Sequence, residues 1–205
     1  MGERVPVIGV LALQGDVEEH LAALRRAGAQ ARAVKQCDQL DGLDGLVIPG
    51  GESTTVMKLL QRFGLASPIV ERVRAGLPLW GTCMGMIVAA HDVADVKQQT
   101  LDVLDITVRR NAFGRQNESA EVDLAVPAIG AKPFAAIFIR APWIERTGPG
   151  VELLASREGH GVMVRQGNVL ATSFHPELGK DTRVHEYFLS IVREAARIGK
   201  RSTAA

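Results

Sequence analysis

Apolar residues in the first part of the chain occur either in short continuous runs or at helical spacing. Residues 5–13 (VPVIGVLAL) form a nearly continuous apolar run, which is typical of a strand buried on both faces of a parallel sheet. Residues 17–27 then predict a helix, with Asp16 as its N-cap and Gly28 as its stop. The chain therefore opens with a strand followed by a helix.

This strand–helix alternation continues as far as His91. The expected strands are Ala31–Val34, Leu46–Ile48 and the run that starts at Leu79, and the expected helices are Thr54–Phe63, Pro68–Ala75 and Cys83–His91. Ser67 as N-cap and Pro68 at the first helical position are the start signal for the second of these helices. The repeated order predicts a parallel sheet with helices on both faces.

The second half of the chain contains more strand-like segments than helical ones. The expected strands are Leu104–Arg110, Ala136–Arg140, Val151–Ser156, Val162–Arg165 and Val169–Phe174. Residues 166–168 (QGN) predict a hairpin turn before the last strand, so some of these strands should be antiparallel. A final helix has one apolar face, formed by Val184, Tyr187, Phe188, Ile191, Val192, Ala195 and Ile198, and residues 199–205 are expected to be a frayed tail.

Together these segments predict an α/β fold, a three-layer sandwich with a mostly parallel central sheet plus antiparallel additions. At 205 residues the chain suits one domain, residues 1–205, with a substantial core. A net charge of +1 gives no electrostatic case for nucleic acid or an anionic membrane as a partner. No apolar run reaches the roughly 18 residues of a membrane helix, and no signal peptide is evident before the first strand.

The apolar run from Leu79 ends in Gly81-Thr82-Cys83-Met84-Gly85. A strand that enters a sharp turn and then a helix presents one side chain, here Cys83, as in the nucleophile elbow Gly-x-Ser-x-Gly. The glycines fit because such a turn leaves no room for side chains beside the nucleophile. A buried structural cysteine is the alternative reading of Cys83.

The base that a thiol nucleophile needs is expected at the end of the strand 169–174, where His175-Pro176-Glu177 follows. The proline favours an extended His175, and residues i and i+2 of an extended chain point the same way. Glu177 can then hold one ring nitrogen while the other faces the thiol. This pattern predicts Cys83, His175 and Glu177 as nucleophile, base and orienting group, and it favours the catalytic reading of Cys83.

Attack of a thiolate on a carbonyl also requires donors for the resulting oxyanion. One is expected to be the backbone N–H of Met84, the residue after the nucleophile. The other is expected from residues 50–53 (GGES), and in particular from Gly51, because glycine backbone can approach a substrate closely. The same turn could instead cradle phosphate, although it lacks the Gly-Lys-Ser/Thr of a P-loop, or it could cap a helix through Ser53.

The remaining cysteine and histidines show no catalytic pattern. Cys37 forms neither a metal-ligand spacing nor a disulfide framework with Cys83, so it is interpreted as structural. No metal or cofactor is expected, and a reducing cytoplasm is the expected location because Cys83 must stay reduced. The other histidines are interpreted as surface groups or satisfied core groups; they are His20, His91, His160 and His185.

The chain resembles the class I, or triad, glutamine amidotransferases in residues 81–85 and 175–177. Further motifs narrow the resemblance to the glutaminase subunits of pyridoxal 5′-phosphate synthases: residues 46–55 (LVIPGGESTT), 11–15 (LALQG), 110–116 (RNAFGRQ) and 139–142 (IRAP). These motifs span residues 11 to 177, so the resemblance covers most of the chain. Met84 departs from the family pattern, in which a small residue is expected after the nucleophile, and this puts local packing in doubt.

The resemblance implies hydrolysis of L-glutamine to L-glutamate and ammonia, with the ammonia passed to a pyridoxal phosphate synthase subunit. It implies that the synthase forms a twelve-membered double ring, so that the complex contains twelve copies of each subunit. The substrate contacts that it implies are Gly51, Glu52, Ser53, Arg110, Ile139 and Arg140. Arginine suits the substrate's α-carboxylate, and an acidic or hydroxyl group suits its α-ammonium.

Other interpretations stay open at this point. A glutaminase of another pathway, such as histidine biosynthesis, would share the triad but lacks support from residues 50–55. A non-catalytic regulatory or scaffold module would keep the fold, and Met84 leaves that possibility open. Arg109, Arg110 and Arg115 could form a nucleic-acid patch, although few aromatic residues and near-zero net charge favour a substrate anchor with solvated neighbours.

Overall fold

The computed structural model describes residues 4–94, 96–111 and 119–202. Within these residues a 10-stranded mixed sheet has the order β2-β1-β3-β4-β12-β11-β9-β6-β5, and β10 pairs with β11. Its strands are β1 (Val7–Leu11), β2 (Gln30–Val34), β3 (Gly45–Ile48), β4 (Leu79–Thr82), β5 (Ala90–Val93), β6 (Leu104–Arg109), β9 (Trp143–Thr147), β10 (Glu152–Arg157), β11 (His160–Gln166) and β12 (Val169–Thr172). Neighbours from β2 to β12 run parallel, whereas β11 is antiparallel to β12, β9 and β10.

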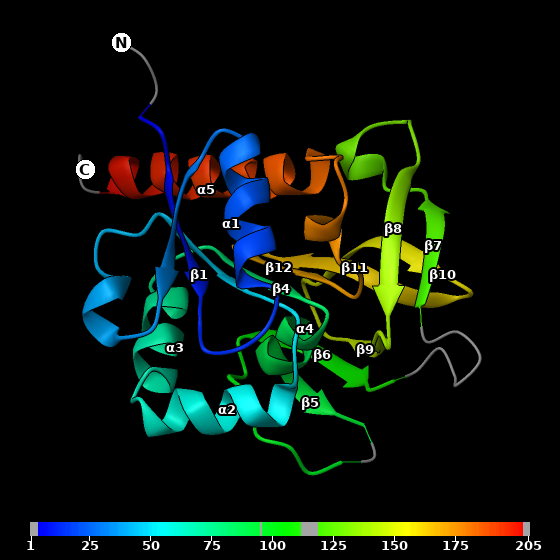
Figure 1. The fold of residues 1–205 in the computed structure, drawn as a ribbon, viewed down its shortest axis with the longest axis horizontal. Coiled ribbons are helices and arrows are strands. Elements are labelled where there is room, and N and C mark those ends of the chain that lie inside the picture. The colour runs from blue at the N-terminus through cyan, green and yellow to red at the C-terminus, as the bar shows by residue number, and fades with distance from the viewer. Residues whose placement is uncertain (1–3, 95, 112–118, 203–205) are drawn as a thin grey trace.

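Helices cover both faces of this sheet (Figure 1). Helices α1 (Val17–Arg26) and α5 (Arg183–Ser202) pack on one face, beside a separate two-stranded sheet of β7 (Ser119–Leu124) and β8 (Phe134–Ile139). Helices α2 (Ser53–Arg62), α3 (Ala66–Arg74) and α4 (Met84–Ala89) pack on the other. Short 3₁₀ turns are η1 (Cys37–Leu40), η3 (Pro127–Ile129) and η4 (Pro176–Leu178). The predicted three-layer α/β sandwich is confirmed.

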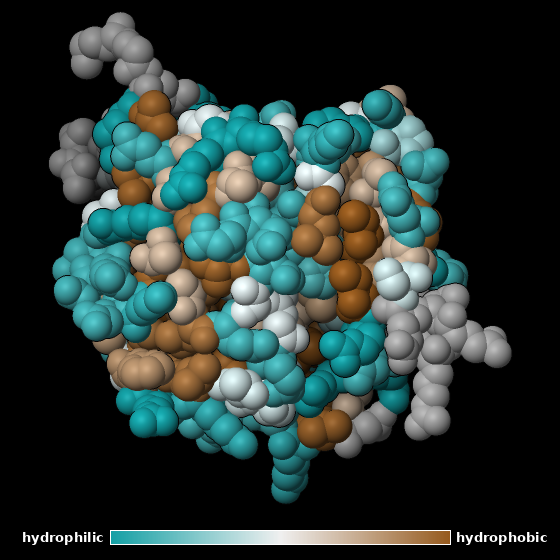
Figure 2. Space-filling model, in the orientation of Figure 1, coloured by the Kyte–Doolittle hydropathy of each residue, from teal (hydrophilic) through white to brown (hydrophobic). Residues whose placement is uncertain are grey.

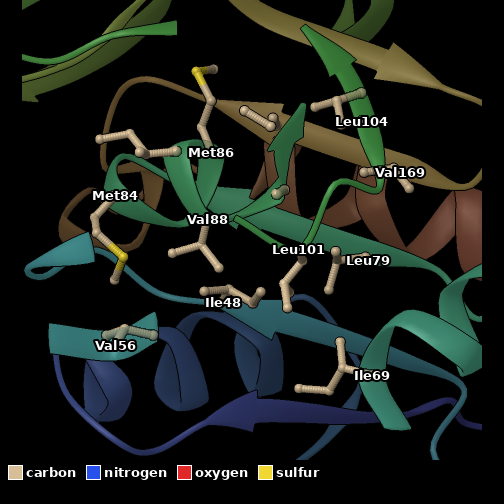
Figure 3. Packing of buried hydrophobic residues seen from close by; sticks show 14 of the residues in the cluster. Ile48, Val56, Ile69, Leu79, Met84, Met86, Val88, Leu101, Leu104 and Val169 are labelled. Atoms are coloured by element: carbon tan, nitrogen blue, oxygen red, sulfur yellow. The ribbon is translucent and has the colours of Figure 1, made fainter. Parts of the chain in front are cut away.

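The central strands fill both layers because successive side chains of a strand point to opposite faces. On β3, Leu46 and Ile48 belong to the cluster under α2, α3 and α4, whereas Val47 belongs to the cluster under α1 and α5. On β4, Leu79 belongs to the first of these clusters and Trp80 to the second. Figure 3 shows the first of these clusters, in which the sheet meets the helices. The near-continuous apolar runs in the sequence therefore reflect strands buried on both faces.

Several strands differ from the prediction. Strands β5, β7 and β9 are not predicted from the sequence, because each carries exposed polar residues that hide the apolar pattern. The predicted strand Ala136–Arg140 corresponds to β8, which pairs with β7 outside the main sheet. The predicted hairpin is confirmed, since Gln166 pairs with Val169 across the turn.

Some helix boundaries also differ from the prediction. Helix α3 begins at Ala66 with Leu65 as N-cap, not at Pro68 with Ser67 as N-cap; proline is tolerated there because N–H groups of the first turn have no intrahelical partner. Helix α4 ends at Ala89, not at the predicted His91, because β5 begins at Ala90. Helix α5 continues to Ser202, past the start of the predicted tail.

The predicted apolar face of α5 is buried only in part. Val184, Phe188, Ile191 and Val192 are buried, whereas Ile198, near the C-terminal end of α5, is 62% exposed. Figure 2 shows apolar side chains on this side of the molecule in small groups between hydrophilic ones. Among the described helices, none is both long enough and apolar enough to cross a membrane.

Candidate active site

Strand β4 leads into a tight turn at Cys83 and then into α4, as predicted. Cys83 has φ 49° and ψ −106°, a left-handed conformation that costs a non-glycine residue about 1–3 kcal/mol. Its backbone N–H donates to the carbonyl of Thr172 at 2.7 Å, which fixes the turn to the end of β12. A Cβ at Gly81 would lie 2.3 Å from the carbonyl oxygen of Gly85, and one at Gly85 would lie 2.1 Å from that of Ile48. The glycines are therefore required by backbone contacts around the turn.

The imidazole of His175 is held by Glu177 from the same turn. Nδ1 of His175 lies 2.7 Å from Oε1 of Glu177, and the backbone N–H of His175 donates to the carbonyl of Ile137 on β8 at 2.8 Å. The contact with Glu177 is the one predicted, but the 3₁₀ turn η4 produces it, not an extended chain. Both side chains are nearly inaccessible to solvent, at 6% exposed for His175 and 0% for Glu177.

The surroundings of His175 favour its protonated form. Burial would lower the pKa of His175, but hydrogen bonds with Asp16, Cys83 and Glu177 outweigh that effect and raise it well above the ordinary value. Burial raises the pKa of Glu177, although the hydrogen bond from His175 opposes this shift. An imidazole that carries a second proton beside the sulfur stabilises the thiolate, the nucleophilic form of cysteine.

A pocket of about 370 Å³ lies over the nucleophile. The structure brings every substrate contact implied by the resemblance to its lining: Gly51, Glu52, Ser53, Arg110, Ile139 and Arg140. Cys83, Met84 and His175 line the same pocket, and the Sγ atom of Cys83 is 3.8 Å from the carbonyl oxygen of Ile139. Residues 112–116 of the motif that follows Arg110 lie outside the described residues.

Glu52 acts as the N-cap of α2, a role that the sequence suggested for Ser53. Its carboxylate accepts from the N–H groups of Thr54 at 3.2 Å and Thr55 at 2.8 Å. Burial opposes ionisation, but the hydrogen bonds from both threonines outweigh it and lower the pKa of Glu52 to about 2. The same carboxylate is 3.2 Å from the Arg110 guanidinium. Glu52 therefore joins the helix cap to the cationic side of the pocket.

Gln98 and Gln14 also contact residues of the site, and neither was predicted from the sequence to do so. The Oε1 atom of Gln98 accepts from Ser53 at 3.2 Å and from Arg110 at 3.1 Å. The Oε1 atom of Gln14 accepts from the backbone N–H of Glu52 at 2.8 Å. These glutamines hold the turn at residues 50–53 from two sides.

Helix α1 and its N-cap also contribute side chains that were not predicted to belong to the site. Oδ2 of Asp16 lies 3.3 Å from Nδ1 of His175. His20 is fully buried, with Nε2 3.0 Å from Oγ1 of Thr82 and 3.4 Å from Oε2 of Glu177. Asp16 and His20 are four positions apart and so lie on the same side of α1. The four-residue spacing of an acid and a histidine directly after β1 is the sequence signal that could have assigned both residues to the site.

Met84 fits its position through burial in the core. Its side chain is 2% exposed and belongs to the cluster that includes Ile48 and Val56, as Figure 3 shows. The structure therefore accommodates the larger residue beside the nucleophile, and its thioether adds to the packing between α4 and α2.

The other histidines are not all surface or satisfied groups. His185 is fully buried, and both of its ring nitrogens lack a hydrogen-bond partner among the described residues; this corrects the interpretation made from the sequence. Burial lowers the pKa of His185 to about 3. By contrast, His91 contacts Asp102 at 2.7 Å and His160 stacks on Trp143. Cys37 and Cys83 are both free thiols, as expected.

Gly50, on the glycine-rich turn, lies against the His175 ring. A Cβ at position 50 would lie 2.5 Å from Cε1 of His175 and 3.0 Å from Oδ2 of Asp16. We expect Gly50→Ala to displace the imidazole and lower kcat of the reaction expected at Cys83 about 100-fold, since misplacement by about 1 Å can have that effect. Steady-state kinetics with circular dichroism to verify folding would test this, and an unchanged kcat would contradict it.

Comparison with known proteins agrees with this geometry. The family model described as the SNO glutamine amidotransferase family matches residues 10–194. The pyridoxal 5′-phosphate synthase subunit PdxT of Streptomyces avermitilis is 56% identical over 190 residues, covering 92% of this chain and 94% of the relative. The same-named protein of Mycobacteroides abscessus is 54% identical, covering 92% of this chain and 98% of the relative.

Solved structures give the same result. A crystal structure described as a glutamine amidotransferase is 50% identical, with a TM-score of 0.86, and covers 90% of this chain and 98% of that chain. A putative GMP synthase protein from Thermoplasma acidophilum has a TM-score of 0.69 at 19% identity, covering 97% of this chain and 100% of that chain, and so supports the fold alone. On its sequence and its fold, this chain belongs to the SNO glutamine amidotransferase family.

Proposed function

We propose that the chain hydrolyses L-glutamine to L-glutamate and ammonia through Cys83, His175 and Glu177. The observation that carries this proposal is the position of one imidazole between a thiol and a buried carboxylate. Glu177 holds Nδ1 of His175 at 2.7 Å, and Cys83 and His175 line one pocket large enough for an amino acid. This is the arrangement that nucleophilic amide hydrolysis requires.

The reaction begins when the Cys83 thiolate attacks the side-chain amide carbon of glutamine. Negative charge then develops on the amide oxygen, and we assign its stabilisation to the backbone N–H groups of Met84 and Gly51. His175 gives the proton on Nε2 to the leaving nitrogen, so that the C–N bond breaks, ammonia departs and a thioester remains. Water then attacks the thioester carbon, Nε2 accepts one of its protons, the C–S bond breaks, and the new carboxyl group releases the other proton to solvent. The products are glutamate and the regenerated thiolate–imidazolium pair.

Substrate recognition is assigned to the pocket walls. Arg110 supplies a planar guanidinium for the α-carboxylate, and its position is set by Glu52 and Gln98. Glu52 and Ser53 provide acceptors for the α-ammonium group. Ile139, whose carbonyl oxygen is 3.8 Å from Sγ of Cys83, and Arg140 also line the pocket and complete the proposed substrate site.

We propose that a pyridoxal phosphate synthase subunit receives the ammonia. The two proteins would meet in the cytoplasm, in a complex with twelve copies of each. The choice of partner is supported by the relatives, which are described as subunits of pyridoxal 5′-phosphate synthase; the twelve-copy stoichiometry is implied by the family resemblance. An enzyme that produces free ammonia benefits from a docked acceptor, because ammonia otherwise escapes into solution.

Glutamate release from L-glutamine, assayed with the chain alone and then with a pyridoxal phosphate synthase subunit, tests this proposal. We expect strong stimulation by the synthase subunit. Full activity without stimulation would support glutamine hydrolysis but contradict the proposed partnership with the synthase subunit. No glutamate release in either assay, with a folded protein, would contradict the catalytic proposal and favour a regulatory or scaffold role.

A further inference from the structure

His175 has two carboxylates at the same ring nitrogen. Glu177 Oε1 lies 2.7 Å from Nδ1 and Asp16 Oδ2 lies 3.3 Å from it. Glu177 comes from the turn that carries His175, whereas Asp16 comes from the start of α1. One carboxylate is sufficient to orient an imidazole, so the second requires a separate explanation.

The side chain of Asp16 does not make the helix-capping contact that its position predicts. Asp16 is the N-cap of α1, yet its side chain makes no capping hydrogen bond. Glu52, the N-cap of α2, makes two such bonds to backbone N–H groups. An N-cap carboxylate normally satisfies an N–H of the first turn, so the Asp16 carboxylate forgoes that contact and instead faces His175.

The backbone also holds Asp16 in this position. Its N–H donates to the carbonyl of Gly50 at 3.3 Å, which joins the start of α1 to the turn proposed to bind the oxyanion. The Asp16 side chain is 38% exposed and lines the pocket, whereas Glu177 is completely enclosed. Water can therefore solvate Asp16 on one side while its Oδ2 atom faces the imidazole.

We propose that Asp16 is a second positioning carboxylate, which shares the Nδ1 proton of His175 with Glu177 and stabilises the imidazolium that pairs with the Cys83 thiolate. This inference rests on the proposed glutaminase function. The charged and titratable groups that face His175 are Asp16 from α1, Cys83 from the elbow and Glu177 from η4, with His20 behind them. His20 is neutral because burial lowers its pKa well below the ordinary value, so it adds no positive charge.

Asp16→Asn tests the inference because asparagine is an equally good N-cap and nearly isosteric. A negative charge near the ring favours the imidazolium, so its removal should let the proton leave at a lower pH. We expect the alkaline limb of the kcat/KM profile, measured with the synthase subunit, to move down by about one pH unit. The titration midpoint of His175, followed by NMR and assigned with His175→Gln, should fall by a similar amount.

Two further variants sharpen the comparison. Glu19→Gln removes the same charge from an exposed position on the first turn of α1 and should leave both midpoints in place. Asp16→Glu keeps the charge and should move the midpoints less than Asp16→Asn does. Unchanged midpoints in Asp16→Asn would overturn the inference. An increase in KM at every pH, with no shift of the midpoint, would also overturn it and assign Asp16 to the substrate's ammonium group.

The NMR titration separates this inference from the proposed function. If the wild-type chain released no glutamate, the proposed function would fail, yet the His175 midpoint would still report whether Asp16 stabilises the imidazolium. If the enzyme were active and the midpoint did not move, only the role of Asp16 would fail.

Discussion

Cys83→Ala is expected to abolish glutamine hydrolysis and to leave the fold nearly unchanged. The substitution removes the atom that forms the thioester in the proposed mechanism, and within the described residues the pocket lining offers no second thiol near His175. We expect kcat to fall by about 10⁴-fold or more, as for other enzymes that lose their nucleophile. Because Cys83 is 7% exposed and loses only its sulfur atom, stability should change by no more than about 1 kcal/mol.

The measurement is glutamate release in the presence of the synthase subunit, with thermal unfolding to verify the fold. Cys37→Ala is the matched control, because it removes the other free thiol, which donates to the carbonyl of Gly64 at 3.2 Å. The control should keep wild-type turnover. Turnover close to wild type in Cys83→Ala would rule out Cys83 as the nucleophile.

Gly85→Ala is expected to destabilise the fold as well as the site. The new Cβ would lie 2.1 Å from the backbone carbonyl oxygen of Ile48, and neither backbone can move without shifting β3 or α4. Overpacking typically costs 1–3 kcal/mol and occasionally more, so we expect a loss of about 3 kcal/mol. For a chain of this size that loss corresponds to a decrease of roughly 6–12 °C in the unfolding midpoint.

Thermal unfolding by circular dichroism would measure this decrease, and the glutaminase assay would measure the accompanying loss of activity. Gly179→Ala is the control near the same site. Gly179 has φ −90°, and a Cβ there would come no closer than 3.7 Å, to the carbonyl oxygen of Pro176. If Gly85→Ala unfolded at the wild-type temperature, the close contact with Ile48 would not be a constraint on the fold.

The sequence was sufficient for those parts of the fold and site whose signal is local. The elbow at Cys83 has a local signal, because its glycines are required by contacts within and beside the turn. The contact between His175 and Glu177 is also local, because only Pro176 stands between them in the sequence. The buried central strands were predicted because burial on both faces leaves a continuous apolar run.

The missing parts depend on contacts between segments that are distant in the sequence. Asp16 and Gln14 approach the site only because β1 lies beside β3, so that the turns after the two strands meet. Gln98 reaches Ser53 and Arg110 from a segment with no regular secondary structure. Strands β5, β7 and β9 present polar side chains to solvent, so their sequences lack a continuous apolar run and resemble those of loops.

The adjacency of β4 and β12 has a consequence for the newly synthesised protein. These strands pair in parallel, although Trp80 and Thr172, which join them by a side-chain hydrogen bond, are 92 positions apart. The segment with Cys83 therefore leaves the ribosome long before the segment with His175. Under the proposed mechanism a nascent or prematurely terminated chain carries a thiol without its base. Such chains would release no ammonia before the protein is nearly complete.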